Sequence, residues 1–269
     1  MSKFYYSGDH EAALGDQEFD LVTCSGCEFT FHRFVLGDEW LPVLYGQWTD
    51  AAQVGRFEAA HTTKRNDVFA TAVQRLKLVM RLHHLVSQAG IAGPVRLLDF
   101  GCGDGEVLAT AQLLGLKTYG IDLSDTRADT ARTTGVRVFS NLEEFDEKAG
   151  VRVHAVVLSQ VLEHVSTPLG LLEALAARMV PGGVLFVGVP NCEGIDIPKD
   201  FATFHKVQPL EHINAFTPRT LQRLLERAGF RRLRSPPAFV STRPASALRS
   251  AGTLLFQRNT TDQFFSLTR

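Results

Sequence analysis

The sequence predicts an α/β protein with one doubly wound, mostly parallel sheet of seven strands, an antiparallel final strand and a small N-terminal appendage. Short, nearly continuous apolar runs alternate with helical segments from Val95 onward. Apolar runs without polar alternation are typical of strands that helices cover on both faces. A glycine-rich turn joins the first of these runs to a helix, which is common where such sheets bind ligands.

The elements of this core follow one another in a regular strand–helix order. The expected strands are Val95–Phe100, Leu116–Ile121, Val136–Phe139, Val153–Leu158 and Val184–Val189, followed by Phe230–Leu233 and the antiparallel Gln263–Thr268. The expected helices are Gly105–Leu114, Asp125–Thr134, Pro168–Met179, Pro218–Ala228 and Ala245–Leu255. Such an order is Rossmann-like.

Two regions precede the core. Residues 52–88 carry apolar side chains at helical spacing, for example Val73, Leu76 and Val79, and predict a helix that ends before Gly90. Residues 1–50 are acidic, aromatic and irregular, with strand-like runs at 20–23 and 30–36. We therefore expect an appendage over residues 1–50 and one α/β domain over residues 51–269.

The composition disfavours several classes of protein. The 269 residues are 45% hydrophobic, enough for one sizeable core, and their formal net charge of −1 provides no global field for nucleic acid or anionic lipid. No apolar run approaches the ~20 residues that cross a bilayer, and the N-terminus lacks the apolar stretch of a signal peptide. Four cysteines make no disulfide framework. We expect a cytoplasmic protein with neither a nucleic-acid nor a membrane partner.

A loop with alternating glycines is the strongest local signal. Gly101, Gly103 and Gly105 separate a buried strand from the helix that begins at Glu106. Glycine is required where the backbone turns tightly or a ligand approaches closely, and a helix N-terminus offers unpaired N–H groups. A plain turn needs fewer glycines. We therefore expect this loop to cradle a nucleoside cofactor.

Two acids flank this loop. Asp99 precedes it, where its carboxylate would tie down loop N–H groups or meet an amino group of the cofactor. Asp122 ends the second strand, where an acid can accept both hydroxyls of a ribose. The alternative role for Asp122, capping the next helix, suits Ser124 or Asp125 better.

Taken together, these motifs resemble class I S-adenosylmethionine-dependent methyltransferases of the type 11 and type 23 domain families. Residues 99–105 are similar to the first motif of these enzymes, and residues 158–165 to the segment after the fourth strand. Residues 180–191 resemble the turn into the fifth strand, and residues 211–230 the last core helix. The resemblance covers about residues 95–235. One departure is Val153-His154, where the family usually has an acid.

The resemblance implies S-adenosyl-L-methionine as cofactor and S-adenosyl-L-homocysteine as product. The cofactor-binding core would span residues 93–192, with acceptor-side loops and C-terminal strands over residues 193–269. The residues expected at the cofactor are Asp99, Gly101, Cys102, Gly103, Gly105, Asp122, Leu123, Asn141, Leu142, Ser159 and Gln160. Within this group we interpret Cys102 as a small buried filler rather than a nucleophile.

Methyl transfer from a sulfonium is an in-line displacement in which the alignment of donor and acceptor matters most. A general base helps only when the acceptor must lose a proton, as a hydroxyl does. The candidate bases are His164, His205 and His212. For each histidine, a hydrogen-bonded structural role is the alternative.

The N-terminal segment contains half of a metal-binding pattern. Cys24 and Cys27 have the spacing of one zinc knuckle. Residues 21–31 resemble the second half of a zinc ribbon that precedes some bacterial methyltransferase domains, but the upstream cysteine pair of such ribbons is missing. His10 and His32 would be needed to complete a site. We therefore expect a degenerate ribbon without metal.

Three aromatic residues follow this segment. Trp40, Tyr45 and Trp48 are expected either to line an acceptor pocket or to pack the appendage onto the core.

The predicted function is transfer of a methyl group from S-adenosylmethionine to a small-molecule acceptor. We expect O-methylation of a sugar, a sugar nucleotide or another biosynthetic intermediate, since basic residues in the last seventy positions favour an acceptor with phosphate or carboxylate. C- or N-methylation and a non-catalytic S-adenosylmethionine-binding scaffold are the alternatives. The glycine spacing disfavours a nicotinamide-dependent oxidoreductase. Monomer and homodimer remain open.

Overall fold

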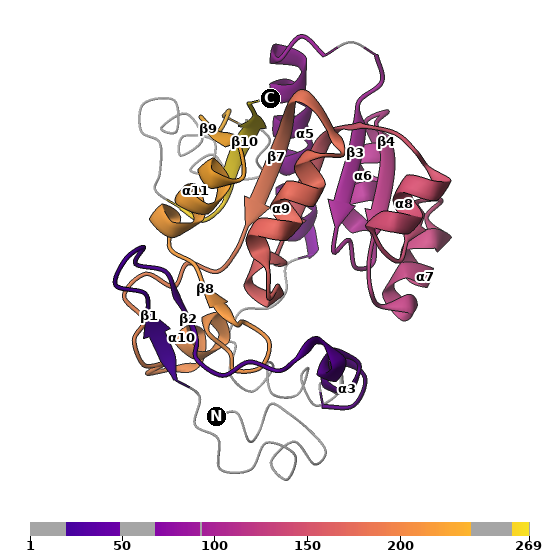
Figure 1. Ribbon diagram of the computed structural model, residues 1–269. Helices are drawn as coiled ribbons and strands as arrows, with labels where there is room; N and C mark the ends of the chain where they lie inside the picture. Colours follow the sequence, from indigo (N-terminus) through magenta and orange to yellow (C-terminus); the bar gives the residue numbers. More distant parts are fainter. Residues whose placement is uncertain (1–19, 49–67, 92, 238–259, 269) are drawn as a thin grey trace. The chain divides into compact units, whose positions relative to one another are not determined.

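The computed structural model describes residues 20–48, 68–91, 93–237 and 260–268 (Figure 1). The chain divides into two compact units. The sheet unit comprises Val68–Leu162, Thr167–Val189 and Leu221–Arg269. The N-terminal unit comprises Met1–Asp67, Glu163–Ser166 and Pro190–Thr220, so it draws on three separate stretches of sequence.

The sheet unit is built on a seven-stranded sheet with the order β5-β4-β3-β6-β7-β10-β9. The parallel strands are β3 (Arg96–Phe100), β4 (Lys117–Ile121), β5 (Arg137–Phe139), β6 (Val153–Ser159) and β7 (Met179–Gly188). Strand β10 (Gln263–Leu267) pairs antiparallel with both β7 and β9 (Phe230–Leu233). The predicted mostly parallel sheet with an antiparallel final strand is confirmed.

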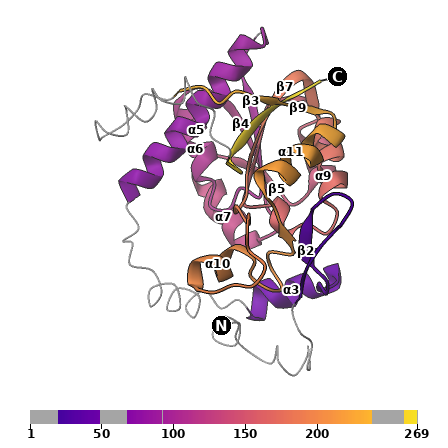
Figure 2. The same cartoon turned by 90° about the vertical axis from the view of Figure 1, so that its left-hand side faces the viewer.

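Helices lie on both faces of this sheet, as a doubly wound fold requires. They are α5 (Val68–Gln88), α6 (Glu106–Leu113), α7 (Asp125–Thr133), α8 (Leu142–Lys148), α9 (Pro168–Ala176) and α11 (Pro218–Arg227). Figure 2 shows α5 and α6 on one face and α9 on the other. Sequence reasoning missed α8, because this short acidic helix buries only Phe145 and has no apolar periodicity.

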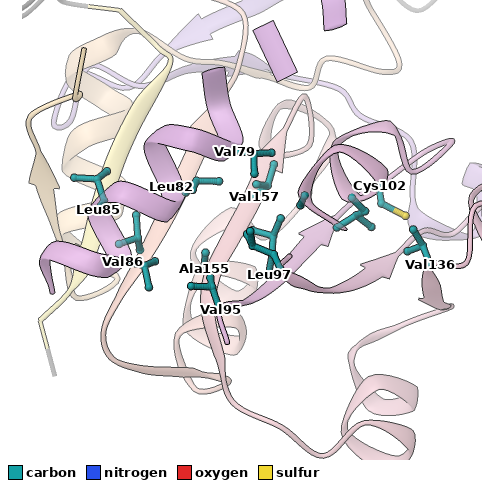
Figure 3. Close-up of a cluster of buried hydrophobic side chains, with 14 of the residues drawn as sticks. Val79, Leu82, Leu85, Val86, Val95, Leu97, Cys102, Val136, Ala155 and Val157 are labelled. Atoms are coloured by element: carbon teal, nitrogen blue, oxygen red, sulfur yellow. The ribbon is translucent and has the colours of Figure 1, made fainter. Parts of the chain in front are cut away.

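The core of the sheet unit forms where α5 and α6 pack on the sheet (Figure 3). Val79, Leu82 and Val86 recur at helical spacing along α5 and are completely buried. They join Leu97 of β3 and Val157 of β6 in one cluster. Complete burial of each such aliphatic side chain contributes about 1.5–3 kcal/mol. This contact therefore anchors α5 to the central strands.

The predicted helix over residues 52–88 is described from Val68 onward, and its first part lies outside the described residues. The predicted helix Ala245–Leu255 also lies outside them. Among the described helices, none is both long and apolar enough to cross a membrane.

The N-terminal unit contains a small antiparallel sheet of order β1-β2-β8. Strands β1 (Leu21–Thr23) and β2 (Thr30–His32) form a hairpin, and β8 (Asn214–Ala215) joins it from far along the chain. The His32 ring Nε2 lies 2.8 Å from the carbonyl oxygen of Val207, a second link between these stretches. Short helices complete the unit: η1 (Asp38–Trp40), α3 (Leu41–Val43), η2 (Leu44–Trp48), η3 (Leu162–His164, partly in this unit) and α10 (Phe201–Lys206).

The packing around Gly120 of β4 leaves no room for a side chain. A Cβ there would lie 2.7 Å from Cys102 Sγ and 3.0 Å from Leu108 Cδ1. We predict that Gly120→Ala lowers the free energy of unfolding by about 1–3 kcal/mol, the usual cost of overpacking. Urea unfolding followed by circular dichroism would measure this change.

Two further variants test the reason for that loss. Cys102→Ala in the Gly120→Ala background should recover part of the stability, because it removes the nearest clashing atom. Gly170→Ala in α9 serves as the matched control, since its nearest neighbour would lie 3.8 Å away. It should be neutral or stabilising by up to about 1 kcal/mol. Wild-type stability of Gly120→Ala would contradict the packing argument.

Candidate functional site

The glycine loop leaves β3 at Phe100 and enters α6 at Glu106. Gly101, Gly103 and Gly105 have φ angles of +76°, +52° and +74°, a left-handed conformation that favours glycine. The N–H groups of Gly101 and Cys102 donate to the carbonyl oxygen of Ile121 at 2.8 and 3.0 Å. These bonds fix the loop to the end of β4.

The three glycines are required for different reasons. A Cβ at Gly101 would lie 2.7 Å from Val161 Cγ2, and one at Gly105 would lie 2.7 Å from Ala131 Cβ. Packing within the protein therefore explains these two positions. A Cβ at Gly103 would meet none of the described residues within 4 Å. The space in front of Gly103 is thus available to a ligand.

Asp122 connects the loop to the next helix. Its Oδ2 accepts the N–H of Gly103 at 2.7 Å, and its Oδ1 accepts the N–H of Ser124 at 2.9 Å. The N-cap of α7 is Ser124, whose hydroxyl accepts the N–H of Arg127 at 3.5 Å. A carboxylate has about four acceptor sites. Asp122 therefore retains capacity for further donors, such as a pair of hydroxyls.

Asp99 and Cys102 lie buried beside this loop. Burial, with a smaller contribution from the charge of Asp122, raises the pKa of the Asp99 carboxyl well above its usual range. Of the loop N–H groups, those of Gly101 and Gly103 donate to Ile121 and Asp122 instead of Asp99. A cationic amine is the partner that a buried carboxylate favours most. Burial raises the pKa of the Cys102 thiol to about 12, which agrees with its interpretation as a filler.

Ser159 and Gln160 lie at the end of β6. Gln160 has a φ of +56°, and its N–H donates to the carbonyl oxygen of Gly188 at 2.7 Å. A non-glycine residue in this region is strained, and such positions cluster at functional sites. The adjacent Val161 is the residue that contacts Gly101, so the end of β6 lies next to the glycine loop.

Two apolar side chains lie near the ends of β4 and β5. Leu123 is 82% exposed, which is unusual for leucine, and Leu142 is half-buried. Asn141 uses its side chain to cap α8, accepting the N–H of Glu144 at 2.8 Å. The predicted cofactor residues thus lie at or just after the carboxyl ends of four adjacent parallel strands, which meet at one edge of the sheet.

The three candidate bases lie together within the N-terminal unit. The ring centroids of His164 and His212 are 4.8 Å apart, and those of His205 and His212 are 5.8 Å apart. Burial lowers the pKa of His164 to about 4. Burial, and then the neighbouring His164, lower the pKa of His212 to about 3. Both are therefore neutral and weak proton acceptors at pH 7, whereas His205 is exposed.

Glu163 belongs to the same group, and the predicted site residues do not include it. Its side chain is fully buried, and neither carboxyl oxygen has a hydrogen-bond partner among the described residues. Burial raises its pKa from 4.5 to about 8. One of its oxygens and one ring nitrogen each of His164 and His212 all lie within 4.8 Å of one another. The sequence signal that could have identified Glu163 is its position as an acid among the apolar residues Val161, Leu162 and Val165.

Cys24 and Cys27 are exposed, form no disulfide and lie in the turn between β1 and β2. Backbone hydrogen bonds from Cys27 and Gly26 lower the pKa of the Cys24 thiol. Within the described part of the chain, no third metal-binding side chain joins them, and His10 lies outside it. The absence of zinc here stays a prediction.

Trp40 and Trp48 stack with ring centroids 5.7 Å apart. Trp48 is 1% exposed and Trp40 is 38% exposed, so Trp48 at least is a packing residue. The side chain of Tyr45 lies outside what the structure describes. Whether this group also lines an acceptor pocket stays a prediction.

The buried Glu163 carboxyl makes stability depend on pH. Because its pKa is about 8 in the folded chain and 4.5 otherwise, the folded state binds more protons between these values, and stability falls as pH rises. Below pH 6.5, the lowered pKa values of His164 and His212 act in the opposite direction. We predict that Glu163 lowers the free energy of unfolding by about 2 kcal/mol between pH 6.5 and 8.

Tryptophan fluorescence during urea unfolding in EDTA would measure this loss, because both tryptophans, Trp40 and Trp48, belong to the N-terminal unit. In Glu163→Gln, the decrease in the free energy of unfolding that the Glu163 carboxyl causes between pH 6.5 and 8 should be absent. Glu173→Gln, at an exposed position of α9, should retain it. Equal pH profiles for wild type and Glu163→Gln would show that the Glu163 carboxyl is not the cause.

Comparisons with known proteins show which domain family the chain belongs to. A family model described as a methyltransferase domain, of type 23, matches residues 69–235. Ubiquinone biosynthesis O-methyltransferase of Xanthomonas campestris pv. campestris (strain B100) is 30% identical over 119 residues, which are 42% of this chain and 49% of the relative. The corresponding enzyme of Shewanella pealeana (strain ATCC 700345 / ANG-SQ1) is 32% identical over 120 residues, covering 42% and 50%.

The chain spans about half the length of the curated relatives it matches. Among solved structures, the plantazolicin methyltransferase BamL, in complex with a triazolic desmethylPZN analog and SAH, aligns with a TM-score of 0.54. It is 15% identical, with 85% of this chain and 94% of that chain covered, and it supports the fold alone. Because the family model matches more than half of the sequence, this chain belongs to the type 23 methyltransferase domain family.

Proposed function

We propose that this protein transfers a methyl group from S-adenosyl-L-methionine to a hydroxyl oxygen of a small molecule and releases S-adenosyl-L-homocysteine. The observation that carries the proposal is the open face of Gly103 beside Asp122, in a chain of the methyltransferase domain family. Curated relatives that are named O-methyltransferases support oxygen as the acceptor atom.

The residues at the sheet edge fit the parts of this cofactor. Asp122 has acceptor capacity left for the two ribose hydroxyls. Asp99 offers a buried carboxyl to the amino group of the methionine portion. The exposed Leu123 and the half-buried Leu142 provide apolar surface for the adenine ring. Gly103 leaves space for close approach of the cofactor to the backbone.

The bound cofactor supplies the methyl group on a sulfonium whose positive charge already activates the leaving group. The protein's own residues would then hold the donor in line with the acceptor oxygen. The acceptor hydroxyl must lose a proton, for which His164, His205 and His212 are the candidates. Of these, His205 is exposed and is thus the most accessible proton acceptor.

The acceptor is proposed to be a small molecule rather than a nucleic acid, since the formal net charge of −1 gives no attraction to phosphate backbones. No disulfide joins the four cysteines, which all lie in the described part of the chain, and this supports a reducing, cytoplasmic compartment. Size-exclusion chromatography with light scattering would distinguish a monomer from a homodimer.

Cofactor binding is predicted to depend on the Asp122 carboxylate and on the absence of a side chain at Gly103. Asp122→Ala and Gly103→Ala should each weaken binding of S-adenosyl-L-homocysteine at least tenfold, equivalent to about 1.4 kcal/mol or more. Isothermal titration calorimetry measures this affinity. Asp129→Ala, an exposed carboxylate on α7, is the matched control and should bind as wild type does. No measurable heat with wild-type protein would refute the proposed cofactor.

Methyl transfer itself should be detected on hydroxyl acceptors. A panel of phenols, catechols and sugars, with and without phosphate or carboxylate, would be incubated with methyl-labelled S-adenosylmethionine and the products analysed by mass spectrometry. His205→Asn should lower kcat on the best acceptor about 100-fold, the usual contribution of a general base, with unchanged S-adenosylhomocysteine affinity. Products methylated only on nitrogen or carbon would contradict O-methylation. Unchanged kcat would exclude His205 as the base.

A further inference from the structure

We propose that Glu163, His164 and His212 bind one divalent transition-metal ion, with zinc as the reference ion. The three residues belong to the N-terminal unit and lie apart in sequence from the glycine loop. This proposal goes beyond the proposed methyl transfer and does not depend on it; with His164 and His212 as ligands, His205 is the remaining candidate base.

The three side chains provide a suitable set of donor atoms. One carboxylate oxygen and two imidazole nitrogens lie within 4.8 Å of one another. Zinc holds such ligands at about 2.0–2.2 Å, which places tetrahedral donors roughly 3.5 Å apart. Side-chain shifts of about 1 Å would therefore close the site. Two imidazoles with one carboxylate favour zinc or iron(II) over magnesium or calcium, which prefer oxygen ligands.

The Glu163 carboxyl gives an independent indication of a missing partner. Its side chain is fully buried, and both oxygens are without a hydrogen-bond partner among the described residues. Buried polar groups in proteins are nearly always paired, because an unpaired buried group is destabilising. A protonated carboxyl would not remove this cost, because its oxygens and its added O–H would still lack partners at hydrogen-bond distance. A metal cation would satisfy the carboxylate directly.

The two histidines are also prepared for metal binding. The Nδ1 atom of His212 lies 3.2 Å from the carbonyl oxygen of Lys206, and the backbone of Glu211 is hydrogen-bonded to His164. Metal-binding histidines usually donate their second ring N–H to a carbonyl in this way, which fixes the tautomer. Burial keeps both rings neutral at pH 7, as coordination requires.

The neighbouring thiol is not part of the donor set. Cys192 directs its Sγ to the carbonyl oxygens of Lys206 and Pro190, at 3.4 and 3.6 Å. Its Sγ is not among the donor atoms that lie within 4.8 Å of one another. A metal at this site would therefore have nitrogen and oxygen ligands without sulfur.

The test uses the full chain carrying Cys24→Ser and Cys27→Ser, which removes the exposed thiol pair as a competing zinc ligand. After EDTA treatment and dialysis, calorimetry with Zn²⁺ should give one site per chain. Glu163→Gln and His212→Asn should each weaken zinc binding by at least about 100-fold, beyond the 10–100-fold typical of outer-shell partners. His83→Gln, at an exposed histidine of α5, should have no effect.

The absorption spectrum of bound Co²⁺ provides a second measurement, which needs no substitution of Glu163, His164 or His212. In the double-serine protein, Co²⁺ should give weak visible bands without an intense near-ultraviolet thiolate band. Absence of zinc binding in that protein, or zinc binding that survives Glu163→Gln and His212→Asn, would overturn the proposal. Absence of the cobalt bands would overturn it even if the cluster variants fail to fold. S-adenosylhomocysteine calorimetry on the same samples reports the proposed function separately.

Discussion

The hydrogen bonds accepted by Asp122 hold together the ends of β3 and β4, the edge of the sheet that is proposed to bind the cofactor. One carboxylate receives N–H groups from the glycine loop and from the start of α7, so it joins the ends of β3 and β4 to two helices. The parallel register of these strands places Phe100 beside Ile121 and thereby brings the loop next to this carboxylate. In this left-handed loop the N–H of Gly103 points to Asp122, whereas the N–H of Gly101 donates to the carbonyl oxygen of Ile121.

The sequence predicted this part of the molecule well, because its constraints are local. Buried parallel strands need continuous apolar runs, so the run that contains Leu97 predicts a strand. A turn at positive φ needs glycine, so Gly101 and Gly105 predict the loop that follows this strand. The ends of the strands differ from the prediction by a few residues. At β7 the strand begins at Met179, because a register shift near Val153 extends its pairing with β6.

Features that depend on distant parts of the chain could not be predicted in the same way. The position of Glu163 among apolar residues hints at burial, but the missing hydrogen-bond partner of its carboxyl depends on packing with residues 190–220, which lie far along the chain in the same unit. The grouping of His164 with His212 depends on the same packing. Asp99 and Glu163 show two surroundings of a buried carboxyl: the first lies near another acid, Asp122, and the second lies beside the imidazoles of His164 and His212.

The pairing of β2 with β8 bears on how the chain acquires its structure. Phe31 lies opposite Asn214, so this strand pair closes a loop that contains most of the sheet unit. Closing a long loop costs more chain entropy, and contacts between distant residues slow folding. During synthesis, the β1–β2 hairpin leaves the ribosome early but cannot gain its third strand until residue 215 has emerged. The parallel core strands β3 to β7 are complete in the nascent chain before that point, so the cluster of His164, His205 and His212 can form only after these strands have been synthesised.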